Sequence, residues 1–204
     1  MPPRCIILLR AASVEDGGEA DAPLSSMGNE EAAHAAHGLA AYLELPGASF
    51  APRGDGEPCA VSVLHSGIAR AEQTAASIAK ILGDAGCSIS GPTAEVGTLS
   101  AMANPDAAKT LLTGGTAPMQ VVVGHLPLLQ ALAIAFGTTD LTTGASDRDA
   151  PTATSKVFAP GGGVLLEQRE DGQWALAHHI GFNINWWCRG ASRYVPAEKE
   201  VNTQ

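Results

Sequence analysis

The chain has 204 residues, of which 45% are hydrophobic and 16% charged, values typical of a single soluble globular domain with a substantial core. Asp and Glu number 21 against 12 Lys and Arg, and the formal net charge of −9 disfavours non-specific binding to nucleic acid or to an anionic membrane. The apolar runs are too short to span a bilayer. An anionic ligand would therefore need a local cluster of cations.

Four cysteines, Cys5, Cys59, Cys87 and Cys188, lie far apart in the sequence and form no Cys-x-x-Cys pair. No secretory leader precedes the first predicted strand. We therefore expect a reduced, cytoplasmic protein in which Cys5 and Cys87 are small core residues.

The first predicted element is a buried strand from Cys5 to Leu9, which is apolar throughout and runs directly into Arg10. A guanidinium at the edge of a sheet can donate two parallel hydrogen bonds to a phosphoryl group and keeps its charge. The same residue could instead pair with a carboxylate at the strand end. A polar loop, Ser13 to Pro23, follows.

A helix is predicted to begin near Ser25, where hydroxyl residues precede Glu30 and Glu31 and carboxylates in a first turn suit the helix dipole. Its small apolar residues recur on one face until about Leu45, and a Pro- and Gly-rich surface connection then covers residues 47–58.

A second strand, 61–64, ends in His65 and Ser66 and leads into a helix predicted from Ile68 to Leu82. Arg70 therefore lies in the first turn of a helix that follows a buried strand. Open α/β folds bind anions at such positions.

The rest of the chain repeats this pattern once more, because a buried strand, 119–123, ends in Gly124 and His125 before an apolar helix. Arg10, Arg70 and His125 are therefore expected along one edge of the sheet. The remaining predicted elements are a short strand at 93–96, helices at 105–112 and 128–136, a long loop or insertion at 137–163, a hairpin at 164–167 and 174–178, and a tail from 181.

Together the motifs resemble those of the histidine phosphatase superfamily, the phosphoglycerate mutase-like fold, and within it the small SixA-type phosphohistidine phosphatases. Arg10-Ala11-Ala12 stands where the family reads Arg-His-Gly or Arg-His-Ala. Pro23-Leu24-Ser25 with Gly28 is similar to its Pro-Leu-Thr and following Gly, Ser66 to Thr74 to its Ser-Pro-x-x-Arg-Ala-x-x-Thr, and Gly124 to Pro127 to its Gly-His-x-Pro. The resemblance extends from Cys5 to about Trp174, and the lack of a large inserted cap favours the SixA branch.

The resemblance implies a three-layer α/β/α domain with a mostly parallel central sheet, which we place at residues 1–180 and follow by a C-terminal extension at 181–204. The composition of residues 137–163 indicates a flexible insertion within this domain. The resemblance also implies removal of a phosphoryl group through a phosphohistidine intermediate, without a metal or other cofactor. Arg10, Arg70 and His125 would hold the phosphoryl oxygens. The nucleophilic histidine of the family would stand at Ala11.

Ala11 has no lone pair to offer, and loss of a nucleophile that acts in concert with its site lowers turnover by on the order of a millionfold. The residue is either a knockout of a phosphatase or a natural loss. In the second case the pocket would bind a phosphorylated ligand or partner, such as a phosphohistidine-bearing protein, or serve different chemistry. As written, the chain is expected to bind phosphate and to turn it over very poorly.

Several further side chains are candidates near the same edge. His65 could replace the missing nucleophile, or it could be hydrogen-bonded at the sheet edge. Glu95 is the nearest carboxylate to the position of the mutase-type acid, but the pattern places it within a strand. Ser13, Ser25 and Ser66 are possible pocket residues.

Other polar and aromatic pairs are interpreted as structural. His34 and His37 stand one helical turn apart without a third ligand, so we expect surface residues and no metal site. His178 and His179 follow each other in a predicted strand and should point to opposite faces. The pair at 186–187, Trp-Trp, is expected to cap the core or dock the tail.

Overall fold

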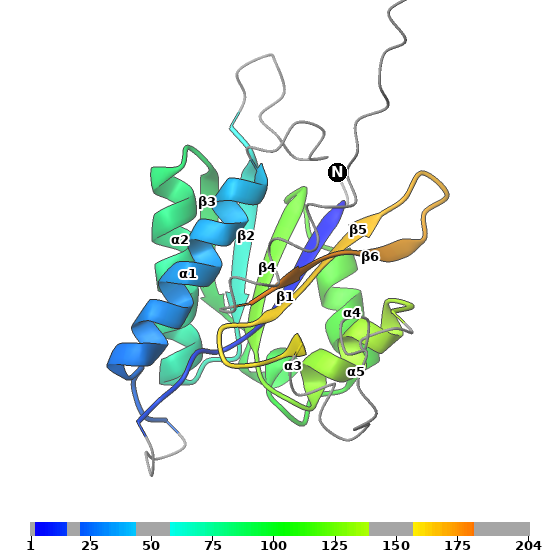
Figure 1. Ribbon diagram of the computed structural model, residues 1–204. Helices are drawn as coiled ribbons and strands as arrows, with labels where there is room; N and C mark the ends of the chain where they lie inside the picture. Colours follow the sequence, from blue (N-terminus) through cyan, green and yellow to red (C-terminus); the bar gives the residue numbers. More distant parts are fainter. Residues whose placement is uncertain (1–2, 16–20, 44–57, 139–156, 182–204) are drawn as a thin grey trace, which may run out of the picture.

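The computed structural model describes residues 3–15, 21–43, 58–138 and 157–181. Within these ranges a six-stranded sheet with the order β3-β2-β4-β1-β5-β6 runs through the middle of the molecule (Figure 1). β1 to β4 run parallel, whereas β5 pairs antiparallel with both β1 and β6. The strands are β1 (Cys5–Arg10), β2 (Ala60–His65), β3 (Ser88–Ala94), β4 (Met119–Gly124), β5 (Gly163–Gln168) and β6 (Trp174–Ile180).

Helices cover both faces of the sheet, which gives three layers (Figure 1). α1 (Ser26–Leu43) and α2 (Ala69–Asp84) lie on one face, and α4 (Pro105–Thr113) and α5 (Leu128–Ala135), with the short α3 (Val96–Leu99), lie on the other. The predicted fold class, a three-layer α/β/α domain with a mostly parallel sheet, is confirmed.

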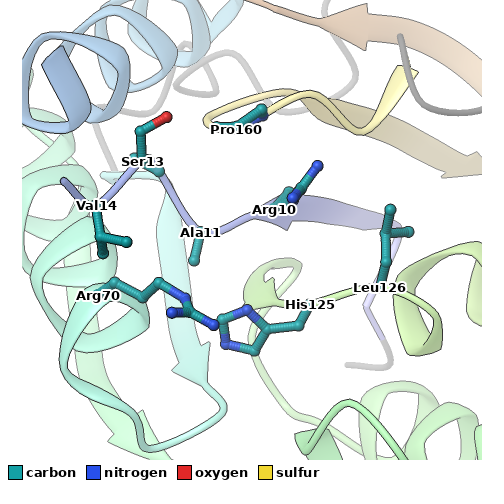
Figure 2. Close-up of a pocket in the computed structure, with 9 residues that line it drawn as sticks. Arg10, Ala11, Ser13, Val14, Arg70, His125, Leu126 and Pro160 are labelled. Atoms are coloured by element: carbon teal, nitrogen blue, oxygen red, sulfur yellow. The ribbon is translucent and has the colours of Figure 1, made fainter. Parts of the chain in front are cut away.

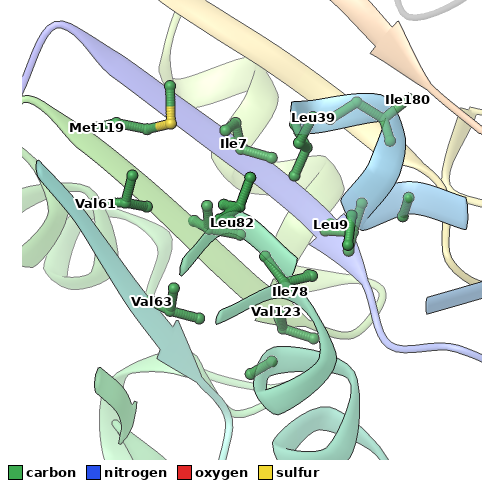
Figure 3. Packing of buried hydrophobic residues seen from close by; sticks show 14 of the residues in the cluster. Ile7, Leu9, Leu39, Val61, Val63, Ile78, Leu82, Met119, Val123 and Ile180 are labelled. Atoms are coloured by element: carbon green, nitrogen blue, oxygen red, sulfur yellow. The ribbon is translucent and has the colours of Figure 1, made fainter. Parts of the chain in front are cut away.

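β1 is apolar throughout because it is buried on both faces. Ile7 and Leu9 pack toward α1 and α2 in one core cluster (Figure 3), whereas Ile6 and Leu8 pack toward α4 and α5 in another. Each of these side chains, once removed from water, contributes about 1.5–3 kcal/mol to folding. The two clusters hold the central strand, and with it the position of Arg10, from both sides.

The predicted bounds of β3 were wrong. The sequence placed a short strand at 93–96, but the observed strand begins at Ser88 and ends at Ala94, and Val96 begins α3. Gly91 and Pro92 hid the strand, since both residues disfavour a regular ladder. A register shift between Ser62 and Leu64 of β2 accommodates them at this exposed edge. Elsewhere the predicted elements agree with the structure to within one or two residues at their described ends.

Two cysteines that are distant in the sequence lie close together in space. Ala60 pairs with Ser88, whose N–H donates to the carbonyl of Cys59 at 2.9 Å, so Cys59 and Cys87 occupy neighbouring positions at the starts of β2 and β3. Burial raises the pKa of the Cys59 thiol to about 11 and also raises that of Cys87. Both thiols are therefore protonated at neutral pH.

Some predicted segments lie outside the described residues. These are the end of the first helix near Leu45, all but residue 58 of the 47–58 connection, residues 139–156 of the insertion, and the extension from 182 onward with its Trp pair and Cys188. Among the described helices, none combines the length and the apolar character needed to cross a membrane.

Candidate active site

The carboxyl edge of the sheet carries a cavity of about 360 Å³ lined by Arg10, Arg70 and His125 (Figure 2). Topology explains why they meet. Arg10 is in register with Gly124, so β1 and β4 deliver Arg10 and His125 side by side, and β2, which also pairs with β4, leads into the helix that carries Arg70. The other lining residues are Ala11, Ala12, Ser13, Val14, Leu126 and Pro160.

Arg10 is half-buried, and its guanidinium donates a hydrogen bond to the carbonyl oxygen of Phe158 at 2.9 Å. Burial, and then the charge of Arg70, lower its pKa, while Glu31 acts in the opposite direction. An arginine keeps its proton despite such a shift. The cavity therefore holds two like charges, and an anion bound between them would relieve their repulsion.

His125 is neutral at physiological pH. Burial, followed by the charges of Arg70 and Arg10, lowers its pKa to about 4. Its Nε2 atom lies 2.8 Å from the hydroxyl of Ser66. The site thus presents two permanent cations and one neutral imidazole.

The depressed pKa of His125 predicts a loss of stability in acid. The unfolded state, in which His has its ordinary pKa of about 6.5, binds more protons than the folded state between pH 6.5 and about 4. The free energy of unfolding is therefore expected to fall as the pH drops through this window, by roughly 2 kcal/mol once solvent screening is allowed for. Urea denaturation at neutral and acidic pH measures this change in the free energy of unfolding. An equal loss in His125→Asn would contradict the assignment to His125.

Ala11 lies at the centre of the cavity wall. Its N–H donates to the carbonyl of Gly124 at 2.9 Å, which extends the pairing of β1 with β4 by one residue. The methyl group faces the side of the cavity occupied by Arg70 and His125 (Figure 2). A side chain introduced here would therefore point at the space between the cations.

Thr74 ties α2 to the loop after β1, a role that sequence reasoning did not assign. Its hydroxyl accepts a hydrogen bond from the N–H of Ala12 at 3.1 Å and donates to the carbonyl of Arg70 at 2.7 Å. Thr74 is fully buried. This one side chain fixes the first turn of α2 relative to Ala11.

A second set of contacts fastens the same loop to α1. Ser13 donates from its N–H and its hydroxyl to the carboxylate of Glu31, at 2.8 and 3.1 Å. The hydroxyl of Ser25 donates to the Ser13 carbonyl at 3.3 Å and accepts from the N–H of Gly28 at 3.0 Å. Ser13 lines the cavity, whereas Ser25 acts as a structural anchor beside it.

Gly28 allows this close approach, because a Cβ atom at position 28 would lie 2.0 Å from the carbonyl oxygen of Ser13. We expect Gly28→Ala to lower the free energy of unfolding by about 2 kcal/mol, the usual range for an overpacked site. Urea denaturation measures the change. Gly97→Ala is the matched control, since nothing lies within 4 Å of a Cβ there; an equal loss in both variants would contradict the explanation.

Other predicted site residues do not line the cavity. His65 is buried, and its Nδ1 accepts a hydrogen bond from the N–H of Gly67 at 3.2 Å, which corresponds to the structural alternative for this residue. Glu95 does not lie within β3, as the pattern indicated, but at the N-cap of α3. Ser66 does not line the cavity, and its hydroxyl contacts Nε2 of His125.

Three further residues near the cavity were not predicted. Glu31 was expected to act on the helix dipole, but the first turn of α1 holds no carboxylate, and Glu31 instead binds Ser13. Phe158 and Pro160 fall in a segment that the composition indicated as a loop, and no local motif marks the hydrogen bond of Phe158 to Arg10 or the place of Pro160 in the cavity lining.

The other histidines stand away from the cavity. His37 is exposed and His34 is partly buried on α1. His178 pairs with Leu165 and His179 with Val164, whose side chains belong to the cores on opposite faces, so the predicted opposite orientation is confirmed. In the described part of the chain, no three His, Cys, Asp or Glu side chains are grouped so that they could hold a metal ion.

Comparison with known proteins identifies the fold class. No family model and no curated protein matches the chain. Among solved structures, it is similar to a protein assigned as the phosphohistidine phosphatase SixA of Agrobacterium tumefaciens, at 23% identity and a TM-score of 0.54 over 88% of this chain and 98% of that one. A protein assigned as SixA of Nakamurella multipartitia follows at 20% identity, TM-score 0.55, and 88% and 97% coverage.

A phosphoglycerate mutase from Plasmodium falciparum is also similar, at 17% identity and a TM-score of 0.52 over 88% of this chain and 94% of that one. Likeness at these identities establishes a shared fold. The chain therefore has an α/β fold with a mixed, mostly parallel sheet that resembles phosphoglycerate mutase.

Proposed function

We propose that this chain is a protein of the histidine phosphatase superfamily that binds the phosphoryl group of a phosphorylated ligand at Arg10, Arg70 and His125. With Ala11 at the position of the nucleophile, it leaves the bond to that phosphoryl group essentially intact. The observation that carries the proposal is the convergence of two guanidinium groups and a neutral imidazole on one cavity, with the methyl group of Ala11 in its wall.

The charges of the cavity suit a phosphate dianion. Arg10 and Arg70 supply two positive charges, which balance the two negative charges of the ligand, and guanidinium groups match phosphoryl oxygens in geometry. The partly buried setting strengthens these contacts. A carboxylate monoanion would leave one cation uncompensated, so we infer a preference for phosphate.

We propose that no other side chain of the cavity wall takes the place of the missing nucleophile. The hydroxyl of Ser13 fastens the loop after β1 to Glu31 of α1, and Nε2 of His125 contacts the hydroxyl of Ser66. The proposal therefore covers both origins of Ala11, a silenced phosphatase and a natural phosphate-binding protein. It includes a domain of residues 1–180 with an extension at 181–204 and a reduced, cytoplasmic setting.

The ligand class follows from the resemblance as well as from the charges. Two of the similar structures are assigned as phosphohistidine phosphatases, so we include a phosphohistidine-bearing protein among the proposed ligands, beside small phosphorylated compounds. A non-phosphate reaction in the same cavity would be the alternative, and Glu31, which binds the cavity-lining Ser13, is an acidic group beside it.

The test measures binding and turnover in the same preparation. We expect saturable binding of inorganic phosphate in calorimetry. We also expect the chain to hydrolyse a phosphoramidate and an aryl phosphate in metal-free buffer no faster than the Arg70→Gln variant does. Absence of binding would overturn the proposal. Binding accompanied by turnover that Arg70→Gln abolishes would keep the pocket but refute its catalytic silence.

A further inference from the structure

Ser66 carries a buried hydroxyl group that contacts His125, one of the residues that line the cavity. It follows β2, and its N–H donates to the carbonyl of Val123 at 3.1 Å, which continues the pairing of β2 with β4. Only 3% of its surface is exposed. Its backbone is thus fixed relative to His125, which stands two residues beyond Val123.

The hydroxyl of Ser66 must donate its proton to an acceptor, because buried hydroxyls are rarely left unpaired. Within the described part of the chain, the contact found for this hydroxyl is Nε2 of His125, at 2.8 Å. A neutral imidazole carries its proton on one nitrogen and accepts on the other. If Nε2 accepts from Ser66, the ring proton resides on Nδ1.

We propose that Ser66 is a positioning residue that holds neutral His125 in the tautomer with its proton on Nδ1, so that the uncharged ring donates a hydrogen bond to a bound phosphoryl oxygen. The inference rests on the proposed function for its ligand. In Figure 2 one ring nitrogen of His125 lies on the side of Ala11, where the phosphoryl group would sit. Ser66 itself lies outside the cavity lining and touches the ligand only through the ring.

The groups around the ring support a neutral donor in the complex as well. Arg10 on β1 and Arg70 on α2 both act on His125, and Glu31 on α1 acts on Arg10. A dianion between the two arginines offsets their combined charge, whereas burial, the largest cause of the lowered pKa of the ring, still disfavours its charged form. At about pH 8 the ring is therefore neutral with or without phosphate.

The tautomer is read directly by ¹⁵N NMR of the labelled full chain at about pH 8, with the His125 signals assigned by their loss in His125→Gln. Expected is a protonated Nδ1 and an unprotonated Nε2, both in the free protein and with saturating inorganic phosphate. In Ser66→Ala the proton should shift in part to Nε2, and Ser66→Thr, which keeps the hydroxyl, should restore the original pattern.

Affinity gives the second measurement. Ser66→Ala is expected to weaken phosphate binding about tenfold, as for the loss of one hydrogen bond to a charged group, while Ser66→Thr recovers most of it and Ser90→Ala, on the exposed β3, leaves it unchanged. A proton on Nε2, or on both nitrogens, in the unmodified chain overturns the inference even if phosphate binds. Failure of the unmodified chain to bind phosphate refutes the proposed function instead. The two failures are distinguishable, because the NMR measurement of the tautomer in the free protein does not depend on phosphate binding.

Discussion

Replacement of Ala11 by histidine is expected to raise hydrolysis of a phosphoramidate by several orders of magnitude. Removal of a nucleophile that works with an intact electrostatic site lowers turnover by up to about a millionfold, and under the proposed function Ala11→His supplies such a nucleophile. An imidazole nitrogen at position 11 would attack phosphorus while the bond to the leaving group breaks. Water would then cleave the phosphohistidine and release phosphate.

The structure also predicts which substrates the Ala11→His variant hydrolyses fastest. Glu95 lies at the N-cap of α3 and not in the cavity lining, so among the described residues no carboxylic acid lines the cavity to protonate a poor leaving group. We therefore expect Ala11→His to act on phosphoramidates and aryl phosphates far better than on alkyl phosphates. Steady-state release of phosphate in metal-free buffer measures all three.

Ala11→Gln is the matched control, because it fills similar space without a nucleophile. It should stay as inactive as the chain as given. If Ala11→His is folded and binds phosphate but gains no turnover, the cavity has diverged in more than its nucleophile. Activity in Ala11→Gln would show that water attacks without a histidine.

The second large effect concerns the arginines. Arg70→Gln should weaken phosphate binding about a hundredfold, since it removes a guanidinium that can make paired, charge-assisted hydrogen bonds. Arg10→Gln should do the same and also disturb the contact with Phe158. Arg169→Gln, on the exposed turn between β5 and β6, is the control. Calorimetry with inorganic phosphate gives the three dissociation constants.

Arg70→Gln has a further consequence, because the charge of Arg70 lowers the pKa of His125. Without that charge the pKa should rise from about 4 toward its ordinary value. An NMR titration of the ring follows this change. Equal phosphate affinity in Arg70→Gln and Arg169→Gln would place the anion elsewhere on the molecule.

Much of the site could be predicted from short patterns around strand ends. Arg10 ends β1, His125 follows β4, and Arg70 lies in the first turn of the helix after β2; parallel strands bring their carboxyl ends to one edge. The convergence of these residues therefore required only the correct assignment of three strands. The phosphate-binding roles of Arg10, Arg70 and His125 were argued from residue chemistry and from the family resemblance, and the role of Ala11 from the resemblance alone; all of them remain predictions.

Contacts between distant segments were beyond the reach of such patterns. The hydrogen bonds that Thr74, Glu31 and Phe158 make to the strand β1 and the loop after it join residues at least 18 positions apart in the sequence. No sequence periodicity encodes such partners. His65 shows the opposite error, since its position at a strand end suggested the cavity while its ring turns to the N–H of Gly67. Side-chain direction after a strand depends on the turn, which the sequence leaves open.

A crystal structure of the chain with inorganic phosphate, at a concentration well above the dissociation constant from calorimetry, tests the central claim most directly. We predict one phosphate in the cavity, with oxygens within hydrogen-bond distance of Arg10, Arg70 and Nδ1 of His125, and the methyl group of Ala11 facing phosphorus. An empty cavity under these conditions, or phosphate bound only at other sites, would contradict the account.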